Sequence, residues 1–541
     1  MSDREWWRGC SIYQIYPRSF QDTNGDGVGD LKGIEERLDH AASLGVDAVW
    51  LSPFFKSPNA DMGYDVSDYC DVDPLFGTLA DFDAVLAKAH ALGLKVIIDQ
   101  VLSHTSDQHA WFAESRASRT GAKADWYVWA DAKPDGTAPN NWLSIFGGPA
   151  WEWDSTRKQY YLHNFLTSQP DLNFHNPQVQ DAILDTVRFW LDRGVDGFRL
   201  DTVNFYFHDA RLRDNPPMAK GKGGEVPDTN PYGFQEHLHD KTQPENLGFL
   251  KRLRALLDSY PERMTVGEVG DSSRSLSIVA AYTQGGDKLN MCYTFDLLSP
   301  TFSPEHVRRC VKAFEDEVAD GWVCWAFSNH DVQRHVTRWT RPGGDPDQVA
   351  RFSIALLASL RGSICLYQGE ELGLGEAEIA FEDLRDPYGI RFWPGFKGRD
   401  GCRTPMVWEE GRHAAGFSTA RPWLPVPDEH RERAVDRQEA DPRSILNFYR
   451  ACLAMRKADP IFTQGALTFV DGPEGVLVFS REFEGRKLVC AFNFGEVPAE
   501  LVMVGERVTE VLTTGGKALD DHHGHVLLPP VGWFVARVEV T

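Results

Sequence analysis

The sequence lacks a hydrophobic run long enough to cross a bilayer. Its best candidate, FSIALLASL at residues 352–360, is about half as long as a membrane helix requires. The N-terminus, MSDREWWRGCSIYQ, contains no apolar segment followed by small residues, as a secretory signal would. We therefore expect a cytoplasmic protein with no membrane partner.

Cysteine is scarce, and basic residues are outnumbered by acidic ones. The nine cysteines are odd in number and form no CxxC pair, which favours buried reduced thiols over a disulfide framework or a zinc site. With 56 Lys plus Arg against 79 Asp plus Glu, the net charge is −23. This charge argues against a nucleic acid partner, because such binding depends on basic residues that displace counterions from phosphate.

Short β-branched and aromatic runs alternate with helical patterns, which is typical of βα units on a parallel sheet. Apolar residues recur at helical spacing over residues 79–94, 179–194 and 349–362. Eight candidate strands predict an α/β fold, a closed (β/α)₈ TIM barrel with catalytic groups at the C-terminal strand ends. These strands are residues 11–17, 47–53, 95–101, 197–201, 264–269, 290–296, 322–329 and 363–369.

Two connections are far longer than usual and divide the barrel. Residues 1–102 form its first part, and residues 103–177, after the third strand, are predicted to be a small inserted domain. The second part spans residues 178–461, with a long loop at 205–245 that should overhang the barrel mouth and a loop-rich extension at 370–440. Alternating segments in residues 462–541 predict a C-terminal antiparallel β domain.

Acidic residues and histidines fall where the predicted strands end. Asp201 ends the fourth strand and Glu268 the fifth, His104 follows the third, and His330 with Asp331 follows the seventh. All should meet at one barrel mouth. Three carboxylates and two histidines, without a cysteine nucleophile or phosphate loop, favour cleavage of an acetal in which one carboxylate attacks and another protonates the leaving oxygen.

Two other site types fit the sequence less well. A metal-dependent hydrolase would need closely spaced ligands, but HExxH is absent. The HxH pairs His237/His239 and His523/His525 do not end barrel strands, so we interpret them as solvated surface histidines. The run NGDGVGD lacks the third glycine of a dinucleotide-binding loop, which argues against a nucleotide cofactor.

Six motifs in order indicate a family. They are DQVLSH (99–104), QPDLN (169–173), GFRLDTVN (197–204), GEVG (267–270), FSNHD (327–331) and QGEELG (368–373). The chain resembles the α-amylase superfamily, glycoside hydrolase family 13, and most closely its oligo-1,6-glucosidase and α-glucosidase branch. QPDLN in particular resembles the marker of that branch.

The resemblance implies a role for each carboxylate. Asp201 corresponds to the nucleophile, Glu268 to the general acid/base, and Asp331 to the residue that stabilises the transition state. Such an enzyme retains anomeric configuration through a covalent glucosyl-aspartate. We expect Arg199, two residues before the nucleophile, to keep Asp201 ionised, and Glu268 to have a raised pKa.

The resemblance also implies substrate contacts. His104 and His330 resemble histidines that hold sugar hydroxyls, and Tyr64 resembles a stacking platform under the ring. Asp61 and Arg399 resemble a charged pair that, in exo-acting members, grips the terminal glucose at the non-reducing end.

Two phenylalanines and one threonine complete the predicted pocket. Phe146 and Phe165, from the inserted domain, resemble aromatic walls of the same subsite. Thr202 follows the nucleophile, where members that favour α-1,6 bonds commonly have valine and α-1,4-selective members have alanine or threonine. The sequence therefore predicts a preference for α-1,4 linkages.

A second group of oxygen-bearing residues lies in DTNGDGVGD, after the first strand. Asp22, Asn24, Asp26 and Asp30 lie at even-numbered intervals, as in an EF-hand-type calcium loop without its flanking helices and distal glutamate. Related glucosidases bind Ca²⁺ or Mg²⁺ here and also use the backbone carbonyl that corresponds to Val28. We expect a structural metal, and a tight Asx-rich turn is the alternative.

Together these features predict an exo-acting retaining α-glucosidase that hydrolyses short α-glucosides such as maltose and also transfers glucose from them to hydroxyl acceptors. It should need no cofactor for catalysis. The alternatives are a sucrose- or trehalose-forming isomerase or transglycosylase, and an oligo-1,6-glucosidase. A non-catalytic transporter heavy chain is disfavoured because the catalytic set is intact and no membrane helix is present. We expect a monomer or a homodimer.

Overall fold

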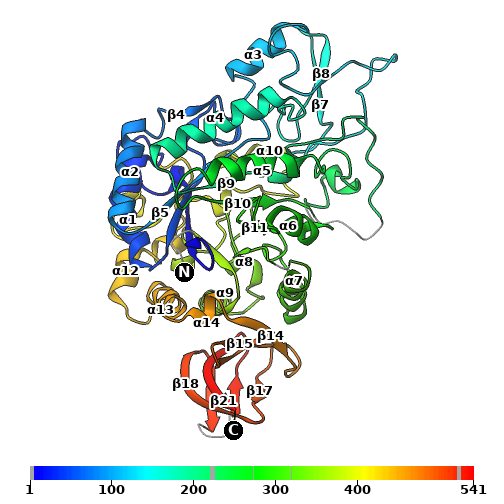
Figure 1. Ribbon diagram of the computed structural model, residues 1–541. Coiled ribbons are helices and arrows are strands. Elements are labelled where there is room, and N and C mark those ends of the chain that lie inside the picture. Colours follow the sequence, from blue (N-terminus) through cyan, green and yellow to red (C-terminus); the bar gives the residue numbers. More distant parts are fainter. Residues whose placement is uncertain (1–4, 220–225, 272, 319, 521–524, 541) are drawn as a thin grey trace.

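The computed structural model describes residues 5–219, 226–271, 273–318, 320–520 and 525–540. A central barrel carries an inserted segment at one end and a β domain at the other (Figure 1). None of the helices in the described part of the chain is long and apolar enough to cross a membrane.

The central barrel is built from one parallel sheet with the order β11-β10-β9-β5-β2-β1-β13-β12. A parallel bridge between Cys292 and Val323 joins the two end strands and closes the ring. Each strand lies within a run predicted from the sequence, so the predicted TIM barrel is confirmed. The strands are β1 (Ser11–Ile15), β2 (Ala48–Leu51), β5 (Lys95–Gln100), β9 (Gly197–Leu200), β10 (Met264–Val269), β11 (Met291–Thr294), β12 (Cys324–Ala326) and β13 (Ser363–Tyr367).

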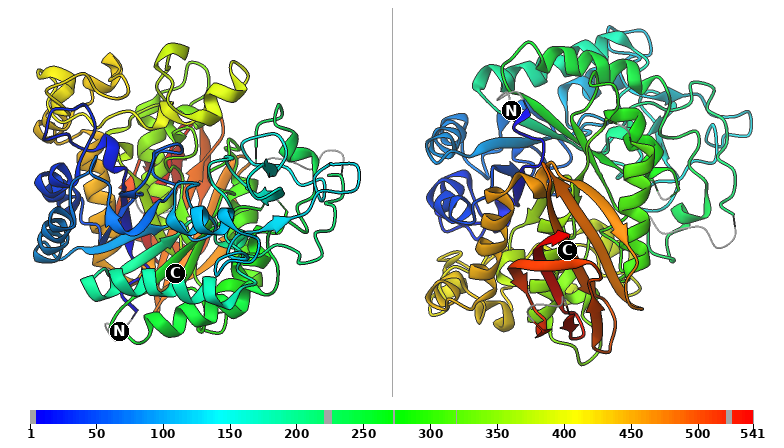
Figure 2. Two further views of the ribbon diagram at one scale, coloured as in Figure 1. Left: turned by 90° about the horizontal axis from the view of Figure 1, so that it is seen from above. Right: turned by 60° about the horizontal axis from the view of Figure 1, so that its bottom comes forward.

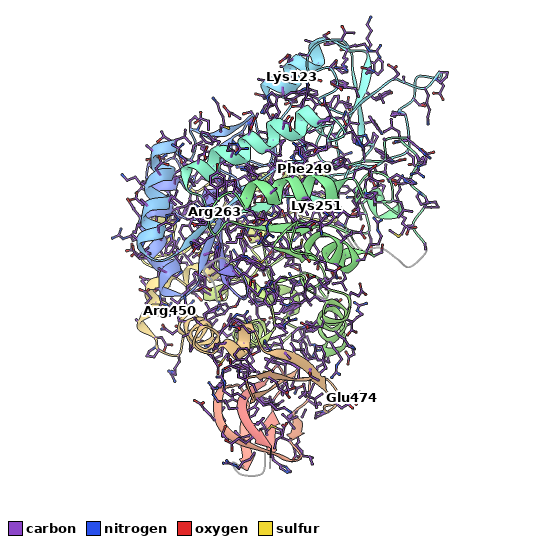
Figure 3. The ribbon with its side chains drawn as sticks, viewed as in Figure 1. Lys123, Phe249, Lys251, Arg263, Arg450 and Glu474 are labelled. Atoms are coloured by element: carbon purple, nitrogen blue, oxygen red, sulfur yellow. The ribbon has the colours of Figure 1, made fainter. Side chains whose placement is uncertain are left out.

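Helices surround the barrel and bury their apolar faces against it. In α5, Phe249 is buried while Lys251 pairs with Asp287 at the surface, so these residues mark the inner and outer faces of the helix (Figure 3). The three helices predicted from the sequence are present as α2, α4 and α9. The surrounding helices are α1 (Leu31–Ser43), α2 (Leu79–Ala91), α4 (Pro177–Arg193), α5 (Asn246–Leu257), α6 (Ser275–Thr283), α7 (Pro304–Glu317), α8 (His335–Trp339) and α9 (Pro346–Ser359).

The segment between β5 and α4 contains a helix and a small sheet of its own. Helix α3 (Ala110–Ala117) precedes strands β6 (Trp129–Ala130), β7 (Trp151–Asp154) and β8 (Gln159–Leu162), which form a three-stranded sheet. A bridge between His104 and Asp171 ties the two ends of the segment together. The inserted segment therefore leaves and re-enters the barrel at one place, beside the C-terminal ends of the strands.

The described residues of the long loop and of the extension form only short elements. Residues 205–245 include the 3₁₀ turn η4 (Pro231–Phe234). The extension after β13 includes α10 (Pro387–Phe392), η7 (Asp400–Cys402), α11 (Asp428–Arg431) and α12 (Val435–Ala440). Asn230 of the loop donates to the Ile145 carbonyl at 2.7 Å and to the Tyr388 hydroxyl at 3.0 Å. One amide thus links the long loop, the inserted segment and the extension.

The C-terminal domain is antiparallel, as predicted. Its larger sheet has the order β14-β15-β16-β21-β18, and its smaller one β17-β20-β19. Figure 2 shows the domain, in orange to red, from two further sides. Helix α13 (Ile445–Ala458) leads into this domain. The strands are β14 (Ala466–Val470), β15 (Val476–Phe483), β16 (Arg486–Asn493), β17 (Ala499–Val502), β18 (Glu506–Thr514), β19 (Lys517–Asp520), β20 (His525–Leu528) and β21 (Trp533–Val540).

Two fully buried arginines attach this domain and α13 to the barrel. Arg456 of α13 donates to the carbonyls of Ala358 and Leu360, each at 2.9 Å, and Arg481 of β15 donates to the Ser359 carbonyl at 2.6 Å. These carbonyls lie at the C-terminal end of α9, where backbone oxygens need donors and partial negative charge favours a cation.

The cysteines and one histidine test two further predictions. All nine cysteines are free, and all except the half-buried Cys70 are buried, as predicted.

The interpretation of His237 as a solvated surface residue is wrong. Its ring is buried, contacts Asp240 at 2.5 Å, and stacks on Tyr232 with ring centroids 3.6 Å apart. His239 is half-buried and His525 pairs with Glu500, whereas His523 lies outside the described residues.

Candidate active site

Arg199 is the centre of the predicted site and is fully buried. It points inward from β9, and its Nη1 donates to Asp99 Oδ1 at 2.8 Å and to Asp201 Oδ1 at 2.6 Å. Its Nη2 lies 2.7 Å from Glu268 Oε1, at the end of β10. One guanidinium therefore contacts three carboxylates from three neighbouring barrel strands.

Tyr293 and Thr202 fix the Glu268 side chain between them. The Tyr293 hydroxyl accepts from Arg199 Nη2 and donates to Glu268 Oε1, both at 2.8 Å. The Thr202 backbone N–H donates to Glu268 Oε2 at 3.0 Å. Both oxygens of the predicted acid/base thus have partners that set the orientation of the carboxyl group.

Burial dominates the protonation of this cluster. It raises the pKa of Asp201 to about 7 and that of Glu268 to about 7, although Arg199 lowers both. It also raises the pKa of Asp99 to about 6. The predicted direction for Glu268 is therefore correct. Arg199 lowers the pKa of Asp201, as expected, but the net shift is upward, because desolvation outweighs the attraction of one cation shared among three acids.

Asp331 has the opposite electrostatic environment. Its Oδ1 accepts from Arg403 Nη2 at 2.9 Å and from Arg399 Nη1 at 3.1 Å, and its Oδ2 lies 3.3 Å from His330 Nε2. Burial raises the pKa of Asp331, but these neighbours outweigh it and bring the pKa well below its usual range. Asp331 is therefore ionised and suited to stabilise positive charge on a substrate.

Asp61 and Arg399 form a buried ion pair in the wall of the site. Arg399 Nη2 lies 2.9 Å from Asp61 Oδ1, and Asp61 Oδ2 accepts from Gln169 Nε2 at 3.0 Å. Arg399 also contacts Asp386 at 2.8 Å, a residue that the sequence analysis did not identify. Burial raises the pKa of Asp61 to about 6 despite the nearby arginine.

Tyr64 and the two histidines pack together at the base of the pocket. The rings of Tyr64 and His330 are parallel, with centroids 5.3 Å apart, and the Tyr64 hydroxyl is hydrogen-bonded to His330 Nε2. His104 Nε2 lies 3.0 Å from the Tyr64 carbonyl. Burial lowers the pKa of His104 to about 4 and that of His330 well below its usual range. Both imidazoles are therefore neutral near pH 7.

The predicted aromatic walls also face this space. The rings of Phe146 and Phe165 lie 5.9 Å apart, and Phe165 packs on Phe205 at 5.5 Å. They belong to a pocket of about 570 Å³ at the barrel mouth. Its lining contains ten of the predicted site residues, namely Asp61, Tyr64, His104, Phe146, Phe165, Asp201, Thr202, Glu268, Asp331 and Arg399. Arg199 and His330 are fully buried and contact these residues from below.

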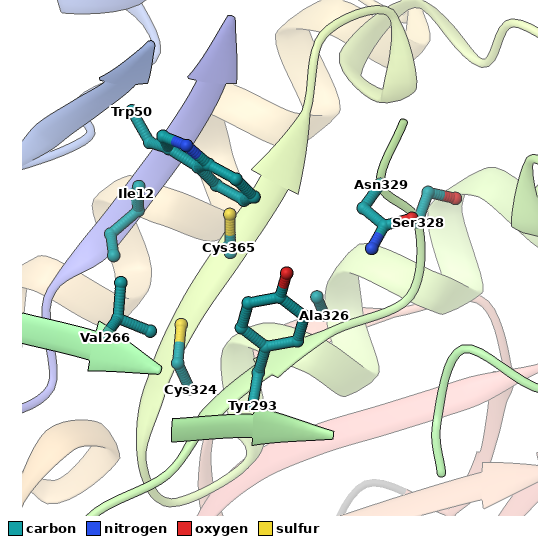
Figure 4. Close-up of a pocket in the computed structure, with 9 residues that line it drawn as sticks. All are labelled: Ile12, Trp50, Val266, Tyr293, Cys324, Ala326, Ser328, Asn329 and Cys365. Carbon is teal, nitrogen blue, oxygen red and sulfur yellow. The ribbon is translucent and has the colours of Figure 1, made fainter. Parts of the chain in front are cut away.

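A much smaller cavity of about 10 Å³ lies inside the barrel, with Trp50, Tyr293, Cys324 and Cys365 among its walls (Figure 4). The Trp50 indole donates to Asp99 Oδ2 at 3.2 Å, and the Tyr293 hydroxyl contacts Glu268. Its walls thus support the acidic cluster, but the space is no larger than one water molecule and has no room for a sugar.

The predicted metal loop is folded largely by its own hydrogen bonds. Asp22 Oδ1 accepts from the backbone of Asn24 and Gly25, and Asp30 Oδ1 accepts from Gly33 at 2.7 Å as the N-cap of α1. Asn24 and Asp26 accept from residues two positions ahead. Within the described residues, no three His, Cys, Asp or Glu side chains form a group placed to hold a metal. Oxygen atoms are the ligands that a hard cation prefers. The loop offers them from Asp22, Asn24, Asp26 and Asp30 and from the Val28 carbonyl, and the metal itself stays a prediction.

Four residues of the site were not predicted from the sequence, namely Asp99, Tyr293, Asp386 and Arg403. Asp99 was within the DQVLSH motif and lies one residue before the end of a barrel strand, so its position was a usable signal. Asp386 and Arg403 lie in the irregular extension, where no periodicity indicates which side chains point inward.

The same family is identified by comparison with known proteins. A sequence model described as "Alpha amylase, catalytic domain" matches residues 14–465. The chain belongs to the α-amylase family. This membership confirms the resemblance drawn from the six motifs.

Members of this family resemble the chain over nearly its whole length. A protein of Rhizobium meliloti (strain 1021) described as "Probable alpha-glucosidase" is 59% identical over 99% of this chain and 98% of its own. The "Oligo-1,6-glucosidase" of Heyndrickxia coagulans is 39% identical over 91% of this chain and 92% of its own.

Solved structures agree with the fold. The crystal structure of the "alpha-glucosyl transfer enzyme, XgtA" has a TM-score of 0.95 and 57% identity, with 99% of each chain covered. The trehalulose synthase MutB from Pseudomonas mesoacidophila MX-45 has a TM-score of 0.90 and 31% identity, again with 99% of each chain covered.

Proposed function

We propose that this α-amylase family member is an exo-acting, retaining α-glucosidase that prefers α-1,4-linked short glucosides such as maltose. The observation that carries the proposal is the position of two acidic groups in one pocket. Asp201 and Glu268 lie on either side of Arg199, within 2.6 and 2.7 Å of it, while Asp61 and Arg399 form a buried ion pair in the same pocket, which we infer closes its end. A closed end leaves room for the terminal sugar of a chain but not for its interior.

In the first chemical step, Asp201 attacks the anomeric carbon while Glu268 donates a proton to the leaving oxygen. The glycosidic bond breaks and a glucosyl ester forms on Asp201. In the second step, Glu268 accepts a proton from water, the water oxygen bonds to the anomeric carbon, and the ester bond to Asp201 breaks. Asp331, which is ionised, stabilises the positive charge that develops on the sugar in both transition states.

The raised pKa of Glu268 supports its role as an acid, because an acid must be protonated when the substrate binds. Neutral His104 and His330 can donate to sugar hydroxyls from one ring nitrogen while the other accepts. His330 Nδ1 lies 2.8 Å from Gln14 Nε2. In this arrangement the glutamine amide donates to Nδ1, so the ring proton of His330 is on its own Nε2. That proton is then available to the tyrosine or to a substrate.

The test is the anomeric form of the glucose released from maltose, followed by proton NMR before mutarotation. Initial release of α-glucose supports the retaining mechanism, whereas initial release of β-glucose contradicts it. Hydrolysis of an α-glucan blocked at its non-reducing end would contradict the exo-acting pocket.

Glucosyl transfer to an alcohol or a second sugar is a related activity that one comparison favours. The 57% identical structure is described as an alpha-glucosyl transfer enzyme. A glucosyl ester on Asp201 reacts with any hydroxyl that is held beside Glu268, since the same base removes the proton. Product profiles from maltose and sucrose, with and without an added alcohol, measure the ratio of transfer to hydrolysis.

A further inference from the structure

Arg399 is held by three carboxylates, and Asp386 makes the most extensive contact with it. Asp386 Oδ2 accepts from the Arg399 backbone N–H at 2.7 Å and from Nε at 3.1 Å. Its Oδ1 accepts from Nη2 at 2.8 Å. This is a two-point contact along one edge of the guanidinium plane, the strongest arrangement that the group can make with a carboxylate.

The contact with Asp386 decides where the other donors of Arg399 point. Nη1 is left to contact Asp331 Oδ1 at 3.1 Å, and the second hydrogen of Nη2 is left for Asp61 Oδ1 at 2.9 Å. Because a guanidinium is planar and rigid, fixing the Nε–Nη2 edge fixes the directions of all its N–H bonds. Asp386 thereby aligns Arg399 with both predicted functional carboxylates.

Asp386 is itself fixed by its surroundings. It is fully buried, and its backbone N–H donates to Asp400 Oδ2 at 2.8 Å. Its Oδ1 also accepts from the Tyr388 backbone at 3.1 Å and caps α10, which brings the Tyr388 ring to 5.0 Å from Phe146. The loop between Asp386 and Arg399 is therefore joined at both ends to the pocket wall.

The backbone of this loop depends on a close approach between its two stems. A Cβ atom on Gly389 would lie 2.4 Å from the Lys397 carbonyl oxygen, so only glycine fits there. Gly398 has φ +80° and would place a Cβ 2.6 Å from the Gly389 Cα. These glycines let Arg399 return to Asp386.

Charge distinguishes Asp386 from Asp61. Burial raises the pKa of Asp386, but Arg399 outweighs burial and brings this pKa below its usual value. For Asp61, in contrast, burial dominates and raises the pKa to about 6. Asp386 therefore stays ionised as a permanent counter-charge. The contacts of Arg399 with Asp61 and Asp331 can then adjust when a sugar binds without leaving the arginine unpaired.

We propose that Asp386 is a positioning residue of the donor subsite, which orients Arg399 so that it bridges Asp61 and Asp331. This inference rests on the proposed function of that site. It assigns no contact with substrate to Asp386 itself.

The first test is Asp386→Asn, which keeps the shape but removes the charge and one acceptor. We expect kcat/KM for p-nitrophenyl α-glucoside to fall about 100-fold, as for a misplaced catalytic group. The matched control is Asp383→Asn, from the same segment, where Asp383 pairs with Arg421 at the surface. The control should retain wild-type kcat/KM. An Asp386→Asn enzyme within twofold of wild type would overturn the proposal.

A double-mutant cycle separates positioning from general structural damage. If Asp386 acts through Arg399, Asp386→Asn should add little to the loss caused by Arg399→Ala. Free guanidinium at millimolar concentration should partly restore Arg399→Ala but not the double variant, which lacks the carboxylate that would orient the ion. The proposal would be contradicted if the losses of kcat/KM in the two single variants multiplied in the double variant, or if guanidinium rescued Arg399→Ala and the double variant equally.

Two further outcomes are also decisive. If Asp386→Asn does not fold, Asp386→Glu replaces it in the cycle, because it keeps the charge but displaces the carboxylate. If the wild type cleaves no α-glucoside, the proposed function fails, and the coupling is then measured from thermal stability. A stability loss that disappears in the Arg399→Ala background supports the positioning role, and an equal loss in both backgrounds refutes it.

Discussion

The backbone N–H of Thr202 donates to Glu268 Oε2 at 3.0 Å, so the residue after the predicted nucleophile directly orients the predicted acid/base. Its hydroxyl donates to Asp201 Oδ2 at 3.2 Å. Thr202 has φ 40° and ψ 50°, a left-handed conformation that is unfavourable for a β-branched residue. Such strain is typical of functional sites, where the surrounding structure holds it in place.

We predict that the wild type prefers maltose over isomaltose and that Thr202→Val shifts the ratio toward isomaltose. Valine keeps the backbone bond to Glu268 but loses the hydroxyl contacts with Asp201 and with Ser103, which lies 3.1 Å away. Thr202→Ser is the control because it keeps the hydroxyl. The measurement is the ratio of kcat/KM on the two disaccharides, and a clear wild-type preference for isomaltose would contradict the prediction.

Asp201→Asn should abolish turnover while the protein stays folded. We expect kcat to fall by roughly 10⁴-fold or more, as for other lost nucleophiles. Because burial raises the pKa of Asp201 to about 7, the folded state binds more protons than the unfolded state between about pH 4 and 7. Wild-type stability therefore falls as pH rises through this window. The variant should become the more stable protein above pH 7, as measured by thermal unfolding, and near-normal kinetics would exclude the assigned nucleophile.

The pH profile of kcat/KM should be bell-shaped, with both limbs near neutrality. Asp201 and Glu268 share Arg199 and each has a pKa of about 7, so the pair loses its protons in two linked steps. The active form carries one proton, and activity falls when the pair binds two or none. In Glu268→Gln, the pH profile for a substrate with an acidic phenol leaving group should lose its alkaline limb. The loss of kcat/KM should be smaller for that substrate than for maltose. Equal losses on both substrates would contradict acid catalysis by Glu268.

The sequence predicted the barrel because each strand is a local pattern that recurs eight times. It also placed Asp201, Glu268 and Asp331 at one mouth, since strand ends in a closed parallel barrel face the same side. The closing contact is weaker than a full strand pair, as β11 and β12 are joined by a single bridge at Cys292. No sequence pattern would have indicated that.

Protonation and the irregular segments could not be predicted in the same way. The pKa of Asp201 depends on complete burial and on sharing Arg199 with Asp99 and Glu268, which are distant in sequence. Asp386 and His237 lie in loops, where only the folded chain decides whether a polar side chain is buried. Their partners could be identified only from the structure.

The loop at residues 22–30 should bind Ca²⁺ and stabilise the folded state without taking part in catalysis. At 100 times its dissociation constant, such an ion adds about 2.7 kcal/mol to the free energy of unfolding. Chelation should therefore lower the thermal midpoint, added Ca²⁺ should restore it, and Asp22→Asn should remove the response. An unchanged midpoint under all three conditions would show that the hydrogen bonds of the loop suffice without a metal.

We expect the activity to depend steeply on substrate length. In the proposed function, the ion pair of Asp61 and Arg399 closes the pocket at the non-reducing end of the sugar. Asn230 ties the loop at 205–245 to the inserted segment and to Tyr388. A polymer could enter only by its tip, and few contacts beyond the reacting bond would add to catalysis. We therefore expect kcat/KM to fall steeply from maltose to maltohexaose and to be nearly absent on starch.

Asn230→Ala provides the matched variant for this prediction, because it releases the rim while Asp61 and Arg399 stay paired. It should raise the ratio of maltohexaose to maltose activity, and the enzyme should still act only from the non-reducing end. Asp61→Asn should instead raise KM for every chain length, since it weakens the grip on the terminal glucose. If the wild type cleaves maltose and maltohexaose with comparable kcat/KM, the mouth is open, and the length of the acceptor side is not restricted by the loop.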